Sequence, residues 1–161
     1  MSLIFSRQRN LGEKVESVFF SAGIQAMILF RISHFTARYK ILRALRIPTI
    51  IYRLNQFFCL ADIDPGANIS RNLLLPHPSG VVIGSTASIG KGVTIMQNVT
   101  IGSKRLGDVG KRHPTIEDGV FIGPNAVILG DIIIKRNARI GAGAIVLADV
   151  NENETIMGIH K

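Results

Sequence analysis

The sequence is nearly devoid of cysteine and tryptophan, with one Cys and no Trp among its 161 residues. A single cysteine, Cys59, excludes a disulfide within the chain, which is typical of proteins of a reducing cytoplasm. Because Cys59 stands among Phe57, Phe58 and Leu60, we interpret it as a small buried hydrophobe rather than a nucleophile. No second Cys or His stands at metal-ligand spacing, so no metal site is predicted.

Long apolar runs are also missing. The longest, residues 18–32, is interrupted by Ser21, Gln25 and Arg31. It is shorter than the roughly 20 residues that span a bilayer. The first ten residues carry basic side chains without an apolar stretch and a cleavage site, so no signal peptide is predicted. We therefore expect a cytoplasmic protein, with a location at the inner face of the membrane as the alternative.

Acidic residues are scarce in the N-terminal third. Residues 1–60 hold nine Lys or Arg and two acids, whereas residues 61–161 hold ten and nine, so the net charge of +8 is concentrated near the start. Such an excess of positive charge can bind nucleic acid, an anionic membrane or an acidic substrate, or it can be a solvated helix face. Nucleic acid is the weakest of these, because no aromatic platform or known motif accompanies the charge.

A six-residue repeat runs through the rest of the chain. Large aliphatic residues recur at this stride in two runs: Ile83, Ile89, Ile95 and Ile101, then Ile116, Ile122, Ile128, Ile134, Ile140 and Val146. The fourth residue after most of them is also aliphatic: Ala87, Val93, Val99, Val120, Ala126, Ile132, Ala138 and Ala144.

This stride predicts a three-sided β-helix. It differs from the period of about 3.6 residues of an amphipathic helix. It fits a chain that turns a corner every six residues, with each flat side forming a short strand. Three sides close a coil of about eighteen residues, so Ile83 should stack against Ile101 at the usual strand spacing of about 4.8 Å. The fold class is therefore mainly β, a parallel β-helix of hexapeptide repeats.

Two irregularities divide the repeat domain, which we place at residues 61–161. The runs are separated by a stride of fifteen residues, from Ile101 to Ile116, so we expect an inserted loop at 103–115. Long loops on rigid scaffolds commonly carry function. Residues 61–76 look like an imperfect first coil, in which the repeat is shifted by two residues relative to Ile83.

Residues 1–60 are predicted to form an α-helical cap. Apolar residues recur at three and four over residues 13–38, which indicates an amphipathic helix. A second helical stretch is expected over 40–58, with Pro48 as a break or a first-turn residue. Arg43, Arg46 and Arg53 would share one face of it. The apolar face of the cap must be buried against the coil, another subunit or a membrane.

Two histidines stand out as candidates for chemistry. His77 follows Asp62 by fifteen residues, nearly one coil, so the two would lie close together. A carboxylate beside an imidazole makes a general base, although a turn histidine bonded to the backbone is the simpler interpretation. His113 ends the inserted loop and follows His77 by thirty-six residues, so both would face one edge of the prism if the loop is extruded.

The sequence resembles the serine acetyltransferase branch of the left-handed β-helix, hexapeptide-repeat acyltransferases. The resemblance covers about 60% of the chain and is carried by DIDPGANI (62–69), HPSGVVIG (77–84), VTIMQNVTIG (93–102), GKRHPTIEDGVFIGPNAVILGDI (110–132) and RIGAGAIVLADV (139–150). It implies an acetyl-coenzyme A-dependent O-acetyltransferase and a homotrimer, which the cap would pair into a hexamer or attach to a membrane.

The resemblance also implies roles for particular residues. Asp62 and His77 would form a catalytic dyad, with His113 as a second active-site histidine. Acceptor contacts would come from Arg112, Ser79 and Ser85. Coenzyme A would lie in a groove between neighbouring prisms, beside Gly102, Ser103, Gly123, Ala126, Gly141 and Ala142, with Lys135 and Arg136 at its phosphates.

Departures from the family pattern bear on the acceptor. The family usually places Asp before the catalytic histidine, where it contacts the amino group of serine; here the residue is Pro76. Loss of that carboxylate favours a neutral hydroxyl, so we expect O-acetylation of a surface polysaccharide or its precursor, with serine O-acetylation in cysteine biosynthesis as the alternative. A non-catalytic β-helix scaffold is the remaining hypothesis, and it would not bind coenzyme A.

Overall fold

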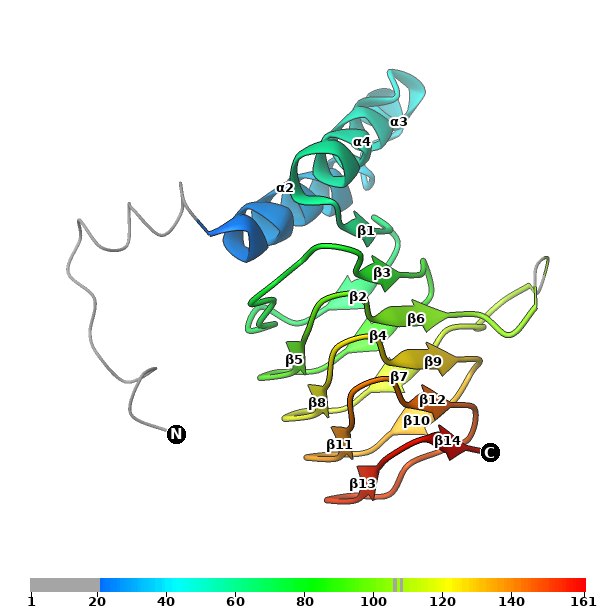
Figure 1. Ribbon diagram of the computed structural model, residues 1–161. Helices are drawn as coiled ribbons and strands as arrows, with labels where there is room; N and C mark the ends of the chain where they lie inside the picture. The colour runs from blue at the N-terminus through cyan, green and yellow to red at the C-terminus, as the bar shows by residue number, and fades with distance from the viewer. Residues whose placement is uncertain (1–20, 106, 108) are drawn as a thin grey trace.

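A helical cap sits on one end of a three-sided prism in the computed structural model, which describes residues 21–105, 107 and 109–161 (Figure 1). The cap consists of α2 (Ala22–Thr36), α3 (Lys40–Ala44) and α4 (Ile47–Cys59). Short parallel strands then wind around the prism, coil after coil, toward the C-terminus. The parallel β-helix expected from the six-residue stride, left-handed as the family resemblance implies, is confirmed.

Each flat side of the prism is one parallel sheet. Face A is made of β1 (Asp62–Ile63), β3 (Val82–Ile83), β6 (Thr100–Gly102), β9 (Val127–Leu129), β12 (Ile145–Val146) and β14 (Ile159–His160). Face B is made of β2 (Asn68–Ile69), β4 (Ser88–Ile89), β7 (Thr115–Ile116) and β10 (Ile133–Ile134). Face C is made of β5 (Thr94–Ile95), β8 (Phe121–Ile122), β11 (Arg139–Ile140) and β13 (Thr155–Ile156).

Three corners join the faces in the order A, B, C, and we name each corner by the faces it joins. The A–B corner comprises residues 64–67, 84–87, 103–114, 130–132 and 147–149. The B–C corner comprises residues 70–73, 90–93, 117–120, 135–138 and 151–154. The C–A corner comprises residues 75–81, 96–99, 123–126, 141–144 and 157–158.

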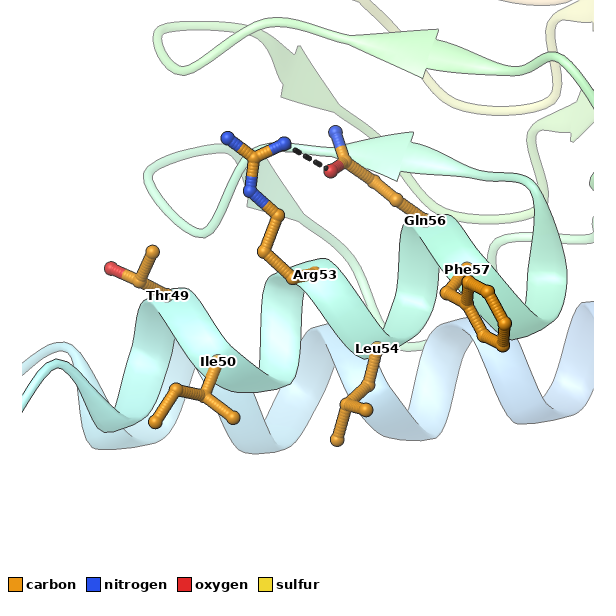
Figure 2. Close-up of a pocket in the computed structure, with 6 residues that line it drawn as sticks. All are labelled: Thr49, Ile50, Arg53, Leu54, Gln56 and Phe57. Atoms are coloured by element: carbon orange, nitrogen blue, oxygen red, sulfur yellow. Dashed lines mark hydrogen bonds between the residues drawn. The ribbon is translucent and has the colours of Figure 1, made fainter.

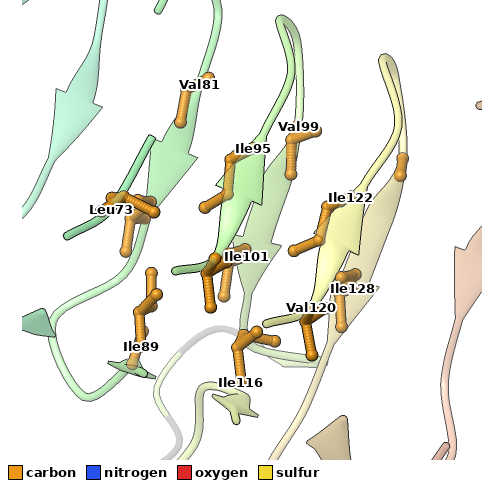
Figure 3. Close-up of a cluster of buried hydrophobic side chains, with 14 of the residues drawn as sticks. Leu73, Val81, Ile89, Ile95, Val99, Ile101, Ile116, Val120, Ile122 and Ile128 are labelled. Carbon is orange, nitrogen blue, oxygen red and sulfur yellow. The ribbon is translucent and has the colours of Figure 1, made fainter. Parts of the chain in front are cut away.

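The repeat isoleucines fill the inside of the prism (Figure 3). Ile83 pairs with both Ile63 and Ile101 on face A, and Ile122 pairs with Ile95 and Ile140 on face C. The inward residue of every strand from β1 to β13 is buried, while its neighbour faces outward, as the alternation of a strand requires. Each coil before the last therefore contributes one aliphatic side chain per face to a continuous core.

Corner geometry is set by residues with left-handed backbone. At the C–A corner this position is taken by Gly80 (φ 72°), Asn98 (φ 57°) and Asn125 (φ 60°). Asparagine tolerates this conformation better than most residues with a side chain, which explains its recurrence here. Gly80 has a further constraint, because a Cβ there would lie 2.1 Å from Oδ1 of Asn98. The short polar residues in the repeats are thus turn residues.

Coil length explains the two irregularities in the repeat. Ile63 and Ile83 are partners at a separation of twenty residues, so the first coil is two residues longer than the regular coil. Ile101 pairs with Ile128, a separation of twenty-seven, because the segment Ser103–Pro114 is thrown out at the A–B corner before β7 begins at Thr115.

Helix α2 is attached to the first coil through its small and basic residues. Its inward face carries Gly23, Ala26, Phe30 and Ser33. A Cβ on Gly23 would lie 1.8 Å from the carbonyl oxygen of Leu75, so only glycine permits this close approach. Part of the helix expected over 13–38 is confirmed by α2, and residues 13–20 lie outside the described residues.

The second predicted helix is divided in two. Arg46 adopts φ 59° between α3 and α4, and Pro48 lies in the first turn of α4, where its missing N–H is no cost. The expectation that Arg43, Arg46 and Arg53 share one helix face is therefore wrong, because the backbone reverses its twist at Arg46.

Helix α4 turns its apolar residues outward. Its buried residues are Pro48, Asn55 and Cys59, and the Asn55 amide donates to the carbonyl of Ala26 on α2 (3.1 Å). On the other side, Ile50, Leu54 and Phe57 project away from the core beside Arg53 (Figure 2). Burial raises the pKa of the Cys59 thiol, consistent with an unreactive core residue. None of the described helices has the length and apolarity to cross a membrane.

Candidate active site

Asp62 lies on the outer side of face A, at the start of the first coil. Its carboxylate accepts a hydrogen bond from the hydroxyl of Tyr52, which reaches down from α4. Burial, followed by this hydrogen bond and the Asp62 charge, raises the pKa of Tyr52, so the phenol stays protonated and remains a donor. Tyr52 was not predicted as a site residue, because no periodicity links a helix residue to a strand ten positions later.

His77 lies in the turn that leads into the neighbouring strand of the same face. The turn is closed against the first coil by Gly80, whose N–H donates to the carbonyl of Leu60 (2.8 Å), and Asp62 pairs with Val82. The backbones that carry the two predicted dyad residues are thus adjacent. The His77 side chain is exposed, flanked by Pro76 and the buried Pro78. Within the described chain, no hydrogen bond joins it to Asp62.

His113 is buried at the A–B corner, with 6% of its surface exposed. Its ring packs over Gly84, where a Cβ would lie 2.1 Å from Nε2. Lys111 secures the end of the loop, since its Nζ donates to the carbonyl of Thr86 (2.7 Å). Absence of a side chain at position 84 therefore makes the space that the imidazole fills.

Thr86 determines the tautomer of His113. Its hydroxyl accepts from the N–H groups of Arg112 (3.1 Å) and His113 (3.2 Å), so its own proton points to Nδ1 of the ring (2.8 Å). The Thr86 N–H also donates to Nδ1 (3.2 Å). With Nδ1 accepting twice, the neutral ring carries its proton on Nε2. His113 is therefore arranged as a hydrogen-bond donor at Nε2, the nitrogen that lies over Gly84.

Charge and burial keep this imidazole neutral. Desolvation lowers the pKa of His113 below its ordinary value, and the cations Arg112 and Lys111 lower it further, against a smaller opposing effect of Asp64. Because the folded-state pKa is depressed, the contribution of His113 to stability is present above its unfolded pKa. That contribution is lost as pH falls through the folded pKa.

Within one chain, His77 and His113 lie at different corners. His77 belongs to the C–A corner and His113 to the A–B corner. The expectation that both face one edge is wrong for a single prism. The coil from Ile101 to Ile128 has twenty-seven residues, nine more than a regular coil, and these nine belong to the extruded loop. Of the thirty-six residues from His77 to His113, twenty-seven therefore follow the prism, which is one and a half coils and not two.

The other predicted substrate-binding residues are divided between the same two corners. Ser79 is exposed in the His77 turn, and its carbonyl accepts from the N–H of Asn98 (3.0 Å). Ser85 lies at the A–B corner, where its hydroxyl accepts from the guanidinium of Arg112 (3.3 Å). Ser85 and Arg112 thus surround His113, together with Thr86, which sequence reasoning missed.

The predicted coenzyme A residues divide in the same way. Gly102 ends β6 on face A and Ser103 begins the A–B corner, whereas Gly123, Gly141 and Ala142 stack at the C–A corner. Ala126 is fully buried, and its carbonyl accepts from the N–H of Thr100 (3.0 Å), so its side chain has no access to a ligand.

Lys135 and Arg136 are exposed at the third corner, B–C. The Lys135 ammonium donates to Asn151 (3.3 Å), and the Arg136 N–H donates to Glu117 (2.9 Å). One chain does not bring them to the glycine-lined corners. Sequence alone could not separate the three edges, because a loop of unknown path changes which corner a residue reaches.

Comparison with known proteins identifies the family of this site. The family model "Bacterial transferase hexapeptide (six repeats)" matches residues 113–148. The serine acetyltransferase of Bacillus licheniformis is 40% identical over 159 residues, covering 99% of this chain and 72% of that protein. The chain belongs to the serine acetyltransferase family. It is thereby placed among the hexapeptide O-acetyltransferases, as the sequence motifs indicated.

Solved members of the serine acetyltransferase family share the fold. A Neisseria gonorrhoeae serine acetyltransferase in complex with serine superposes with a TM-score of 0.82 and 35% identity, over 96% of this chain and 62% of that one. A Brucella abortus serine acetyltransferase in complex with coenzyme A gives 0.83 and 31%, over 89% and 56%. The present chain thus spans little more than half the length of these solved relatives.

Proposed function

We propose that this protein transfers the acetyl group of acetyl-coenzyme A to the hydroxyl of serine. The observation that carries the proposal is the 40% identity over 159 residues to a serine acetyltransferase. The sequence favoured a sugar acceptor on the ground of Pro76. No relative described above supports a sugar, and the names and serine complex of these relatives favour the alternative.

The active site is completed by a second copy of the chain. His77 and His113 occupy the C–A and A–B corners, which flank face A. In a trimer whose A faces turn toward the three-fold axis, the C–A corner of one prism meets the A–B corner of the next. This arrangement also brings Gly102 and Ser103 opposite Gly123 and Gly141, which makes a glycine-lined groove for the pantetheine arm.

His77 is the general base of the reaction. It removes the proton from the serine hydroxyl as the oxygen attacks the thioester carbon. For this role the exposed His77 ring turns toward Asp62, which the Tyr52 hydroxyl fixes; Asp62 then orients the ring and stabilises the imidazolium that forms. As the tetrahedral intermediate collapses, the carbon–sulfur bond breaks and the thiolate takes the proton back from His77. The products are O-acetylserine and coenzyme A.

His113 stabilises the oxyanion. Its one acceptor nitrogen, Nδ1, is occupied by the Thr86 hydroxyl and N–H, so Nε2–H remains as the donor. A preorganised donor at the developing negative charge favours the transition state over the ground state. Its lowered pKa keeps the ring in this neutral donor form near pH 7.

The proposal is tested by release of free thiol from acetyl-coenzyme A with purified full-length protein. We expect serine to support saturable thiol release, while a panel of neutral sugars at equal concentration supports only background hydrolysis. Release with the sugars and none with serine would reject serine as acceptor and restore a glycan. No release with either, together with no coenzyme A binding, would identify the chain as a scaffold.

Pro76→Asp sharpens the same assay. A carboxylate one residue before the general base provides an ionic partner for the ammonium group of serine, which the proline lacks. We expect the KM for serine to fall, with little change in the KM for acetyl-coenzyme A. Pro76→Asn is the matched control of similar size without the charge. An equal effect of both variants would assign the change to relief of the proline turn.

Thr86→Val tests the positioning of His113. The variant removes one hydroxyl that donates to Nδ1 and accepts from two backbone N–H groups. We expect kcat to fall about two- to tenfold, as for loss of one net hydrogen bond, with KM for acetyl-coenzyme A nearly unchanged. Thr86→Ser, which keeps the hydroxyl, should restore the rate. A variant pair with equal rates would show that the hydroxyl does not act through His113.

A further inference from the structure

We propose that a basic groove between α2 and the B–C corner of the first coils binds a phosphate group. The groove has a volume of about 750 Å³, within the usual range for small-molecule sites. It is lined by Arg31, His34, Phe35, Arg38, Asn68, Ile69, Ser70, Arg71, Asn72 and Lys91. We call it the α2 groove. Nothing in the proposed acetyl transfer uses these residues.

The α2 groove combines cations from separate parts of the fold. Arg31 and Arg38 come from α2 and the residues after it, Arg71 from the first B–C turn, and Lys91 from the next turn along the prism. None of the described residues that line the groove is acidic. The nearby carboxylate of Asp118 accepts from the backbone N–H of Lys91 (2.7 Å) and lies outside the lining. A cleft lined by one sign of charge concentrates anions.

Arg31 is held rigidly at the base of the groove. Its two terminal nitrogens donate to the carbonyls of Ile69 and Ser70, both at 2.6 Å, and its guanidinium lies 5.4 Å from the Phe30 ring centre. Burial lowers the pKa of Arg31, and the charge of Arg71 lowers it further. Arg71 is therefore close enough to repel Arg31, and an anion between them would relieve this repulsion.

Arg38 is placed at the groove by His34. The His34 Nδ1 lies 2.8 Å from the carbonyl of Pro65, to which it donates, so Nε2 is the acceptor for Arg38 (3.1 Å). One guanidinium nitrogen is thus used to hold the side chain, and the fork keeps further N–H groups for a ligand. The α2 groove is in this way partly preorganised before an anion arrives.

The number of cations matches phosphate better than a carboxylate. Four cationic side chains face a shared space, and a phosphate monoester offers three acceptor oxygens with a charge of about −1.5 to −2 near pH 7. Guanidinium forks pair with phosphate oxygens in two-point contacts. The side chains of Asn68, Ser70 and Asn72 add neutral donors along the rim. A phosphorylated small molecule or a lipid headgroup provides this chemistry.

The α2 groove lies away from the two corners that carry the candidate catalytic histidines. It is formed at the B–C corner, the vertex opposite face A. In the proposed trimer this vertex points outward, so phosphate binding there leaves the groove between subunits free. The two sites are therefore testable separately.

The test is calorimetric titration of the full-length protein with sodium pyrophosphate at about 0.15 M ionic strength, where a Debye length of about 8 Å screens charges outside the groove. We expect saturable binding with one site per chain. Arg38→Gln/Arg71→Gln should weaken binding at least about tenfold, because it removes two charge-assisted contacts. The matched control is Arg43→Gln/Arg53→Gln, which removes two exposed arginines of the cap outside the α2 groove. We expect it to change the affinity less than about twofold, at the small size of a screened long-range effect.

Further measurements keep the result decisive. Unchanged melting temperatures would show that both double variants remain folded. Both should also retain the thiol-release rate of the parent protein. Flotation with phosphatidylglycerol vesicles, abolished by pyrophosphate, would assign a lipid headgroup; pyrophosphate binding without flotation would assign a soluble phosphate. Absence of saturable binding by the parent protein, or equal weakening by the two double variants, would overturn the proposal.

Discussion

Replacement of His77 by alanine should lower kcat with acetyl-coenzyme A and serine by about 10²–10⁴-fold, the range for loss of a general base. The side chain is exposed in a turn flanked by Pro76 and Pro78, so its removal leaves no core cavity. We therefore expect an unchanged melting temperature. Coenzyme A affinity, measured by calorimetry, should stay within about twofold, since His77 contacts the acceptor rather than the coenzyme.

His160→Ala is the matched control for this variant. His160 lies on β14, where its Nε2 is 2.9 Å from the carbonyl of Asp149, far along the prism from the first coil. It should retain the parent rate. A His77→Ala protein with near-parent kcat would remove the general-base assignment. Loss of coenzyme A binding together with activity would instead indicate that His77 contacts the donor.

Ile134→Ala should lower the free energy of unfolding by about 2–5 kcal/mol, the usual cost of removing a buried isoleucine to alanine. Ile134 is fully buried on β10 and pairs with Ile116. Its loss leaves a cavity in a single column of side chains, and rigid strands on either side prevent the column from collapsing. Chemical denaturation at a fixed protein concentration measures the change, since association alters apparent stability.

The neighbouring residue makes a close control. Ile133 precedes Ile134 on the same strand, but 41% of its surface is exposed. Ile133→Ala removes the same atoms from the outer side of face B and should cost less than about 1 kcal/mol, as surface substitutions usually do. Equal destabilisation by the two variants would show either that the prism interior repacks freely or that another subunit covers this face.

Part of the candidate site could be predicted from spacing. Asp62 and His77 are fifteen residues apart, three quarters of the twenty-residue first coil, so spacing predicted that the turn holding His77 lies near the strand that carries Asp62. His113 could be chosen because it ends a basic loop. What spacing could not give was the corner that His113 reaches, since that depends on how much of Ser103–Pro114 leaves the coil.

The positioning residues were beyond sequence reasoning. Tyr52 reaches Asp62 only because α4 leads directly into β1 with Leu60 in a left-handed conformation (φ 53°). Thr86 and His113 are twenty-seven residues apart, and His113 reaches Thr86 only at the end of a loop that has no periodicity. The α2 groove was also hidden, because Arg38 and Arg71 are distant in sequence and belong to different types of structure.

The amino-acid sequence by itself determined the prism. A stride of six with aliphatic residues inside leaves one way to bury every large side chain, and burial of apolar area dominates folding. Tertiary structure decided which side chains meet at each edge. Contacts such as those of His113 with Thr86 and of Arg31 with Ser70 depend on the path of a loop and on the approach of a helix. These are packing events between distant segments, and no local pattern encodes them.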